Sequence, residues 1–266
     1  MKKLKSFTLP EVLIGINILM FLLVQAVNYT IGDGLIRLGA KVDFLIALGE
    51  YWRLFTAMFL HADLMHLLFN MLALYIFGRD IEHIFGRKKF ALIYFLSGLA
   101  GSALSYLLSD SISVGASGAI FGLMGANLFL YKTNPAVYKR IYGMDYIMLI
   151  GINLVMGFIR PNIDMAGHIG GLIGGFLSAS ALGILPNSPA AVKKMIFNTA
   201  SVLVIILPIV LGTLSIRSKP DVYITGAYYY FIRNNSEKAI SVIDEGIRKH
   251  PENQAIRQFK DQLRIN

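Results

Sequence analysis

The chain of 266 residues contains no cysteine, few charged residues and a single tryptophan. The lack of cysteine excludes disulfides, thiolate metal sites and cysteine nucleophiles within this sequence, and it leaves the redox compartment open. Charged residues make up only 15%, against roughly 25% in a typical soluble domain. Hydrophobic residues make up 55%, and the mean hydropathy is +0.59. This composition, gathered into long apolar runs, indicates a polytopic membrane protein.

Basic residues outnumber acidic ones and give a formal net charge of +9. Here the Lys and Arg residues lie in short patches between apolar runs, which is the distribution that membrane topology requires. Nucleic acid is therefore not an expected partner, whereas membrane lipid is. The first run follows MKKLKS, which resembles the start of a signal peptide. No small-residue cleavage site closes that run before Asn28, so a retained helix is predicted.

The apolar runs predict seven membrane-spanning helices, several of them shorter than the usual length of roughly 20 residues. If the N-terminus is cytoplasmic, twelve basic residues lie in the inner segments and four in the short outer ones. The positive-inside rule then favours a cytoplasmic N-terminus and an extracellular C-terminal tail. We expect a multi-pass protein of a bacterial plasma membrane, with an organelle membrane left open. The expected helices are 12–28, 63–78, 90–108, 117–131, 146–159, 166–185 and 195–215.

The first outer loop, residues 29–60, is half apolar but too interrupted by charge to cross a bilayer. We expect it to lie at the membrane interface. Trp52 stands between Tyr51 and Arg53, which suits an anchor at the level of the lipid headgroups. A plain packing role for the two aromatic rings explains the pattern equally well.

The composition changes again near residue 221, where charges alternate with apolar residues at helical spacing. The segment resembles one tetratricopeptide repeat with a trailing helix. About three repeats are normally needed to close a core. The tail is therefore expected to pack on the outer loops, on a second copy or on a protein partner, and a solvated appendage is the alternative. The residues that carry the resemblance are Gly226, Ala227, Tyr228, Tyr229, Ala239, Ile240, Pro251 and Asn253.

Ser117 lies in the segment GASGAIFG, where a polar stretch gives way to an apolar one. A helix from this serine to Lys132 would rise about 22 Å, less than the roughly 30 Å of the hydrocarbon core. Its first residue can thus lie below the membrane surface. Non-helical backbone at that depth is tolerated only where protein or a water-filled cavity surrounds it. This position is a candidate functional site.

Three further polar residues interrupt apolar helices, and each is costly in lipid. His66 and Asn70 are four residues apart, hence on one face of the second helix. His168 lies near the start of the sixth helix. The second, fourth and sixth helices are predicted to run in the same direction. We therefore expect these side chains and Ser117 to converge at one depth near the outer face.

Glycine spacing indicates how these backbones approach one another. The fourth and sixth helices each carry small residues at intervals of three or four, a pattern that allows close helix contact in membranes. A general base must come within roughly 2.6–3.2 Å of the serine hydroxyl. Helix packing without catalysis is the alternative for these glycines. They are Gly118, Gly122 and Gly125 on the fourth helix and Gly167, Gly171 and Gly175 on the sixth.

The four polar groups suit acyl transfer. A serine hydroxyl is a weak nucleophile and needs an adjacent base, for which His168 is the candidate. His66, Asn70 and the backbone N–H of Ser117 can supply donors to an oxyanion. Asp164 lies one turn before His168, but no acid is clearly placed to orient the imidazole, so a dyad is favoured over a triad. A metal site is not expected, because the usual carboxylate ligands are missing.

These segments resemble the motifs of rhomboid-family intramembrane serine proteases. The resemblance covers residues 12 to 185 and includes HADLMHLLFNM, GASGAIFG and AGHIGGLIGG in the family's order. It implies that Ser117 is the nucleophile and His168 its base. It further implies an oxyanion hole and substrate contacts from His66, Asn70, Gly115 and Ala116. The supporting positions that it implies are His61, Phe121, Gly171, Gly175, and Trp52 with Arg53 as the family's WR motif.

The resemblance also implies a fold and an activity. The fold is an all-α membrane protein, a rhomboid six-helix bundle with a seventh transmembrane helix and a small helical tail. Family members cut membrane-anchored proteins within or beside a transmembrane helix, without a cofactor, so transmembrane protein substrates are expected. Phe121 departs from the tyrosine that often packs on the catalytic histidine. The expected domains are 1–11 (cytoplasmic N-terminus), 12–185 (protease core), 186–215 (linker and seventh helix) and 216–266 (tail).

Two other functions remain open. A catalytically inactive rhomboid-like protein could bind and route transmembrane clients, but such relatives typically lack the serine or the histidine that this chain retains. A transporter or proton channel could use the buried histidines, yet neither an inverted repeat nor an acidic relay is visible. Substrates of the family generally have small residues at the cut and an unstable helix nearby. The sequence does not indicate the physiological substrate, the oligomeric state or the pathway.

Overall fold

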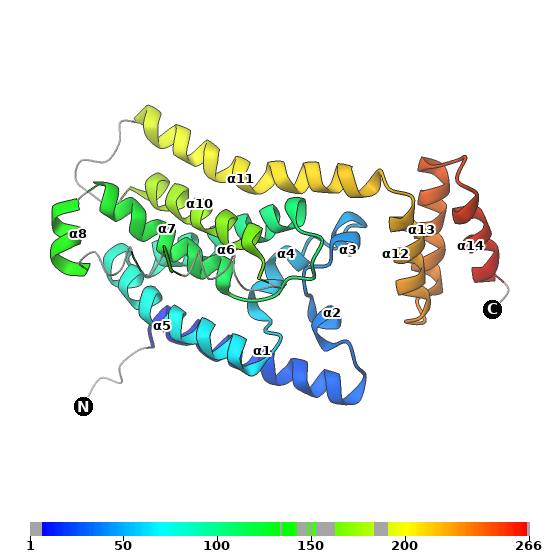
Figure 1. The fold of residues 1–266 in the computed structure, drawn as a ribbon, viewed down its shortest axis with the longest axis horizontal. Helices are drawn as coiled ribbons and strands as arrows, with labels where there is room; N and C mark the ends of the chain where they lie inside the picture. The colour runs from blue at the N-terminus through cyan, green and yellow to red at the C-terminus, as the bar shows by residue number, and fades with distance from the viewer. Residues whose placement is uncertain are drawn as a thin grey trace.

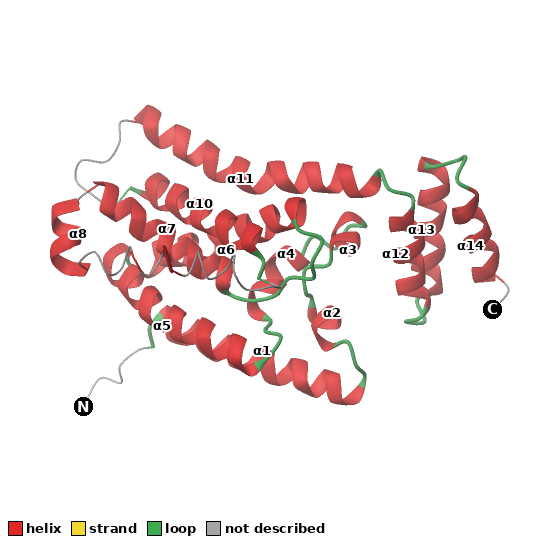
Figure 2. Cartoon of the chain, viewed as in Figure 1, coloured by secondary structure: helices red, strands yellow, loops and turns green. Residues whose placement is uncertain are grey.

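The described part of the chain consists of helices joined by loops (Figure 2). In the computed structural model it comprises residues 7–133, 135–142, 148, 151–152, 163–183 and 191–264. The predicted helix at 146–159 lies largely outside these residues. Within them, the one strand-like contact is an isolated antiparallel bridge between Lys41 and Ser113.

Long helices form the body of the molecule, and a small helical tail follows them (Figure 1). The long helices are α1 (Leu9–Thr30), α5 (Leu64–Phe85), α6 (Arg87–Leu108), α7 (Ser117–Thr133), α10 (Met165–Leu182) and α11 (Ala191–Arg217). Short helices are α2 (Gly34–Leu38), α3 (Asp43–Ala47), α4 (Arg53–Thr56), a 3-10 turn (Ala57–Phe59) and α8 (Pro135–Tyr142). The tail consists of α12 (Asp221–Phe231), α13 (Ser236–Lys249) and α14 (Gln254–Arg264).

Five helices in the described part are long and apolar enough to cross a membrane, namely α1, α5, α6, α10 and residues 194–217 of α11. With 17 residues, α7 is shorter than any of them. It packs against both α6 and α10. A short helix enclosed by longer ones is consistent with a serine placed below the membrane surface. The prediction of an all-α membrane protein is confirmed.

The second helix is longer than the apolar run predicts. Its expected end was residue 78, yet α5 continues to Phe85, and Gly86 alone, with φ of 78°, separates it from α6. The helix continues through polar residues beyond the apolar run, so the helix end predicted from hydropathy was wrong. The extension has a structural role, because the Glu82 carboxylate accepts the Leu9 N–H at 3.0 Å and caps α1.

Glycines bring α7 and α10 into backbone contact. A Cβ added to Gly171 would lie 2.0 Å from the Gly118 carbonyl oxygen, and one added to Gly175 would lie 1.9 Å from that of Gly122. No side chain fits at such a distance. On an adjoining face of α10, a Cβ on Gly170 would lie 2.7 Å from the Ala100 carbonyl oxygen of α6. These three helices thus form a tightly packed centre.

The tail packs on the loop of residues 29–60, which was one of the alternatives predicted from the sequence. A single buried apolar cluster joins the two parts, and a Cβ on Gly226 would lie 2.2 Å from a Leu48 methyl group. The Tyr230 hydroxyl donates to Glu50 at 2.6 Å. The cluster includes Ala40, Val42, Leu45, Leu48 and Leu60 from the loop region, and Val222, Tyr223, Ala227, Val242 and Ile243 from the tail.

The contact between α7 and α10 gives a direct test of this packing. Gly171→Ala would force the two backbones apart, and overpacking of this kind costs about 1–3 kcal/mol. We therefore expect a lower midpoint of thermal unfolding in detergent. Gly15→Ala is the matched control, because nothing lies within 4 Å of a Cβ at that position on α1. Equal unfolding midpoints for the two variants would contradict the packing described.

Candidate active site

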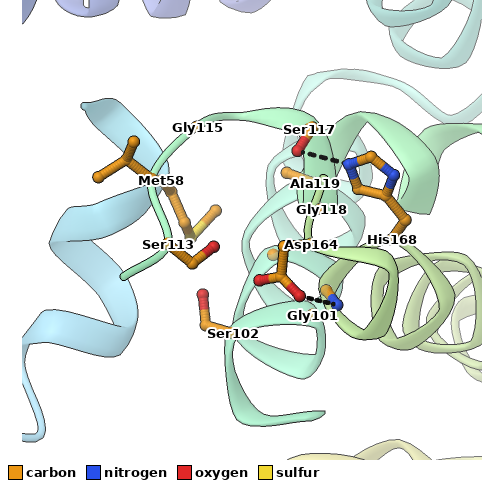
Figure 3. A pocket seen from close by; sticks show the side chains of 13 residues that line it. Met58, Gly101, Ser102, Ser113, Gly115, Ser117, Gly118, Ala119, Asp164 and His168 are labelled. Atoms are coloured by element: carbon orange, nitrogen blue, oxygen red, sulfur yellow. Dashed lines mark hydrogen bonds between the residues drawn. The ribbon is translucent and has the colours of Figure 1, made fainter. Parts of the chain in front are cut away.

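Ser117 and His168 lie within hydrogen-bonding distance of each other. The His168 Nε2 atom is 2.9 Å from the Ser117 Oγ atom, as the dashed line in Figure 3 marks. Ser117 is the first residue of α7 and His168 lies in the first turn of α10. The sequence placed both residues near helix starts at one depth, and the structure brings them together.

Two local features set the starts of these helices. Before α7, Gly115 adopts φ of +125°, a conformation that side chains rarely permit. Before α10, the Asp164 carboxylate accepts the Gly167 N–H at 2.9 Å and so acts as the N-cap. The same carboxylate accepts the Ser105 hydroxyl from α6 at 2.5 Å. Each oxygen of the Asp164 carboxylate thereby accepts a hydrogen bond, one from Gly167 of α10 and one from Ser105 of α6.

The imidazole of His168 is oriented by packing. Phe121, one turn after Ser117 on α7, stacks on it with ring centroids 4.2 Å apart and an interplanar angle of 17°. Within the described residues, the buried Nδ1 atom of His168 has no hydrogen-bond partner. The His168 imidazole thus contacts the Ser117 hydroxyl and is held by an aromatic ring, and no carboxylate among the described residues binds its second nitrogen.

His66 reaches the loop that precedes Ser117. A Cβ added to Gly115 would lie 2.8 Å from the His66 Nε2 atom, so only glycine allows this approach. The buried ring of His61 packs edge-on against His66, with centroids 5.1 Å apart. Asn70 is buried one turn further along α5, and its side-chain amide donates to the His66 carbonyl at 2.9 Å. In this conformation, one of the two N–H donors of the Asn70 amide is used within its own helix.

The N-terminal turn of α7 supplies backbone donors beside the pair. The first helical hydrogen bond runs from the Ile120 N–H to the Ala116 carbonyl. The N–H groups of Ser117, Gly118 and Ala119 precede it and have no acceptor within the helix. They lie at the positive end of the helix dipole, where a developing negative charge is stabilised.

Trp52 and Arg53 lie in the loop of residues 29–60 and organise it. The Arg53 side chain is only 2% exposed and donates to the Ile36 carbonyl at 2.8 Å and to the Ala40 carbonyl at 3.0 Å. It also donates to Glu50 at 2.6 Å. The half-exposed Trp52 ring packs beside the guanidinium, 4.7 Å from its centre. Both residues brace the loop and do not line the pocket beside Ser117.

A small pocket opens next to Ser117, and Figure 3 shows side chains of Ser102, Ser113 and Asp164 pointing into it. Glycines 98 and 101 of α6 and the Met58 side chain complete its wall. Sequence reasoning singled out Gly115 in this wall, but none of the α6 residues. The run GLAGSALS, residues 98–105, was the available signal, because its small residues leave room against α7 and α10.

The helices and the site define an integral multi-pass membrane protein that carries a buried serine–histidine pair. The Rhomboid domain matches residues 48–185, which is more than half of the chain. The chain belongs to the rhomboid family.

Its relatives include named proteases. The rhomboid protease GluP of Bacillus subtilis is 45% identical over 190 residues, which cover 71% of this chain and 37% of GluP. The putative rhomboid protease YdcA of the same organism is 40% identical over 134 residues, covering 50% of this chain and 67% of YdcA. RHOMBOID-like protein 6, mitochondrial, of Arabidopsis thaliana is 47% identical over 142 residues, covering 52% of this chain and 46% of that protein. The chain thus spans less than half of the first and third of these relatives.

The stacking of Phe121 on His168 predicts that the phenyl ring controls the reactivity of Ser117. In Phe121→Ala the imidazole loses its support, and misplacement of a base by about 1 Å can cost up to roughly 10²-fold. We expect fluorophosphonate to label Ser117 at least about tenfold more slowly. Phe121→Tyr should keep the wild-type rate, because the ring is retained.

Phe129→Ala is the matched control. Phe129 is buried on the same helix, but it packs on Phe176 and not on His168. Its loss should lower stability and leave the labelling rate of folded protein unchanged. Equal slowing in Phe129→Ala and Phe121→Ala would assign the effect to helix stability alone.

Proposed function

We propose that the chain is an intramembrane serine endopeptidase that hydrolyses peptide bonds in or next to transmembrane helices of membrane proteins. The observation that carries this proposal is the 2.9 Å contact between the Ser117 Oγ and the His168 Nε2 atoms. A hydroxyl and a base at this distance inside a membrane protein have the geometry of an activated nucleophile.

In the proposed reaction, Ser117 attacks the scissile carbonyl while His168 Nε2 takes the hydroxyl proton. The resulting oxyanion is stabilised by the first N–H groups of α7 and by His66. Asn70 joins them if its amide turns away from the His66 carbonyl. His168 then donates its proton to the leaving amine, which frees one product and leaves an acyl-enzyme on Ser117. Water, deprotonated by the same imidazole, releases the second product and restores the hydroxyl.

The surroundings of Ser117 favour a particular kind of substrate. Glycines and serines line the adjoining pocket, so a small side chain at the cut fits it best. Gly115 and Ala116 offer backbone groups beside the scissile bond. A helical substrate hides its carbonyls in internal hydrogen bonds and must unwind before attack. We therefore propose transmembrane substrates whose helix contains Gly or Pro near the cut.

The proposed location is a bacterial plasma membrane with the N-terminus in the cytoplasm. The tail and the active site then share the extracellular side, where the tail could recruit or present a protein partner. No step of the proposed reaction requires a cofactor or a metal.

The alternative is an inactive protein that binds transmembrane clients. The close approach of Ser117 and His168, with Phe121 stacked on the base, favours catalysis over this alternative. Helix packing alone requires glycines at the contact of α7 and α10, but it does not require a hydroxyl and an imidazole to meet there.

Labelling by a fluorophosphonate tests the proposal on purified protein in detergent. We expect covalent labelling of wild type, none in Ser117→Ala, and labelling slower by about 10²-fold or more in His168→Ala, which lacks the base. Thermal unfolding of each variant checks that the fold is retained. A well-folded wild type that does not react would favour the client-binding alternative.

A further inference from the structure

One residue of the first outer loop, Lys41, holds the segment that leads to Ser117. Residues 109–113 form neither a helix nor a sheet of their own. The Lys41 ammonium donates to the Ser109 carbonyl at 2.8 Å and to the Ser111 carbonyl at 3.0 Å. The Lys41 backbone adds a two-way bridge to Ser113, with N···O distances of 3.0 and 3.2 Å. Side chain and backbone of one residue thus hold this segment along its length.

The burial of this lysine indicates that the contact is costly to form. Its side chain is 1% exposed, and the desolvation of an ammonium costs several kcal/mol unless the charge is fully paired. An ammonium has three N–H donors. Two of them go to the Ser109 and Ser111 carbonyls, and the Asp43 carboxylate lies 2.8 Å from the ammonium as its counter-ion. The charge of Lys41 is therefore paired and two of its donors are used.

The partner carboxylate belongs to the same short stretch of the outer loop. Asp43 is the first residue of α3, so the helix fixes its position. Burial raises its pKa to about 6, an effect that the neighbouring Lys41 ammonium opposes. Without that ammonium, Asp43 would be left as a partly buried and unpaired carboxylate.

The constraint continues from this segment to the active site. Ser113 and Val114 line the pocket, and the Gly115 N–H donates to the Ala57 carbonyl of the outer loop at 2.9 Å. Three residues separate Ser113 from Ser117. The position of the bridge at Lys41 therefore sets where the chain enters Gly115 and the first turn of α7.

We propose that Lys41 is a positioning residue for the serine protease reaction. Its ammonium clamps residues 109–113 and so fixes the turn at Gly115 that presents Ser117 to His168. Lys41 itself does not touch the substrate, and its catalytic consequence rests on the proposed function. Nothing in the sequence pairs this residue with a segment 68 positions away.

A variant that removes the contacts of Lys41 must not leave the Asp43 carboxylate without its counter-ion. Lys41→Met alone leaves the Asp43 carboxylate unpaired, which is strongly destabilising in a buried site. The double variant Lys41→Met/Asp43→Asn removes both charges and keeps side chains of similar size. Lys41→Arg retains a cation with several donors and serves as the conservative variant. Asp43→Asn retains the two donations of Lys41 to the carbonyls.

The experiment uses the full chain in detergent and two readouts. The first is the rate constant of fluorophosphonate labelling, with the amount labelled at saturation as the measure of folded protein. We expect the double variant to reach wild-type saturation at least about tenfold more slowly, because the nucleophile is misplaced. Lys41→Arg should recover part of the rate, and Asp43→Asn most of it. A merely structural role would lower the saturation level and not the rate constant.

The second readout is amide hydrogen exchange of peptides that contain residues 109–117. Exchange there should be faster in the double variant than in wild type. Ile256→Ala is the control for general destabilisation, because Ile256 is buried on α14, which packs on the tail helices α12 and α13. It should lower the unfolding midpoint without changing the labelling rate constant or the local exchange.

Two outcomes would overturn the role of Lys41, namely labelling of the double variant at the wild-type rate, or unchanged exchange in residues 109–117. A folded wild type that does not react with the probe would instead overturn the proposed function. In that case, the exchange result alone decides whether Lys41 holds the segment.

Discussion

The contact between the backbones of α7 and α10 is the constraint on which the remaining structure depends. Serine has a short side chain, so its hydroxyl meets an imidazole on another helix only if the two backbones nearly touch. Gly118 faces Gly171 and Gly122 faces Gly175 with no room for a Cβ on α10. Close backbone contact stabilises a membrane protein because packing, and not the hydrophobic effect, holds helices together in the bilayer. The same glycines that stabilise the bundle therefore create the site.

Packing, and not a carboxylate, sets the orientation of the His168 imidazole in the described residues. Asp164 is the nearest acid to His168 along α10, yet its two oxygens cap that helix at Gly167 and bind Ser105 of α6. Within the described residues, Asp164 does not also form a hydrogen bond with the His168 Nδ1 atom. Phe121 instead holds the plane of the ring. A phenyl ring fixes orientation without adding charge, which suits a base surrounded by apolar residues, where an extra carboxylate would itself need partners.

The sequence predicted the features that depend on local periodicity. Hydropathy located the long helices, glycine spacing identified the contact of α7 and α10, and the positions of Ser117 and His168 at helix starts predicted their meeting. Contacts whose residues belong to no motif or periodic pattern were missed. No local pattern in the sequence indicates that Lys41 pairs with residues 109–113. The same is true of the hydrogen bond between Asp164 and Ser105 of α6. The end of α5 was misplaced for a related reason, since hydropathy reports the membrane boundary and not the end of hydrogen bonding. The helix at 146–159 and the likeness of the tail to a tetratricopeptide repeat stay predictions.

The tail shows why a segment that looks like an appendage in sequence need not behave as one. Tyr230 donates to Glu50, and Glu50 accepts from Arg53, whose guanidinium holds the Ile36 and Ala40 carbonyls. Ala40 directly precedes Lys41, so a continuous set of polar contacts runs from the tail to the segment before Ser117. The apolar cluster shared by loop and tail reinforces these polar contacts.

Deleting the tail would therefore expose Leu48 and disturb the loop of residues 29–60. Loss of cleavage after such a deletion would not by itself show that the tail recruits substrate. Only substitutions on its outer surface, such as Tyr228 or Ile232, separate recruitment from support of the loop.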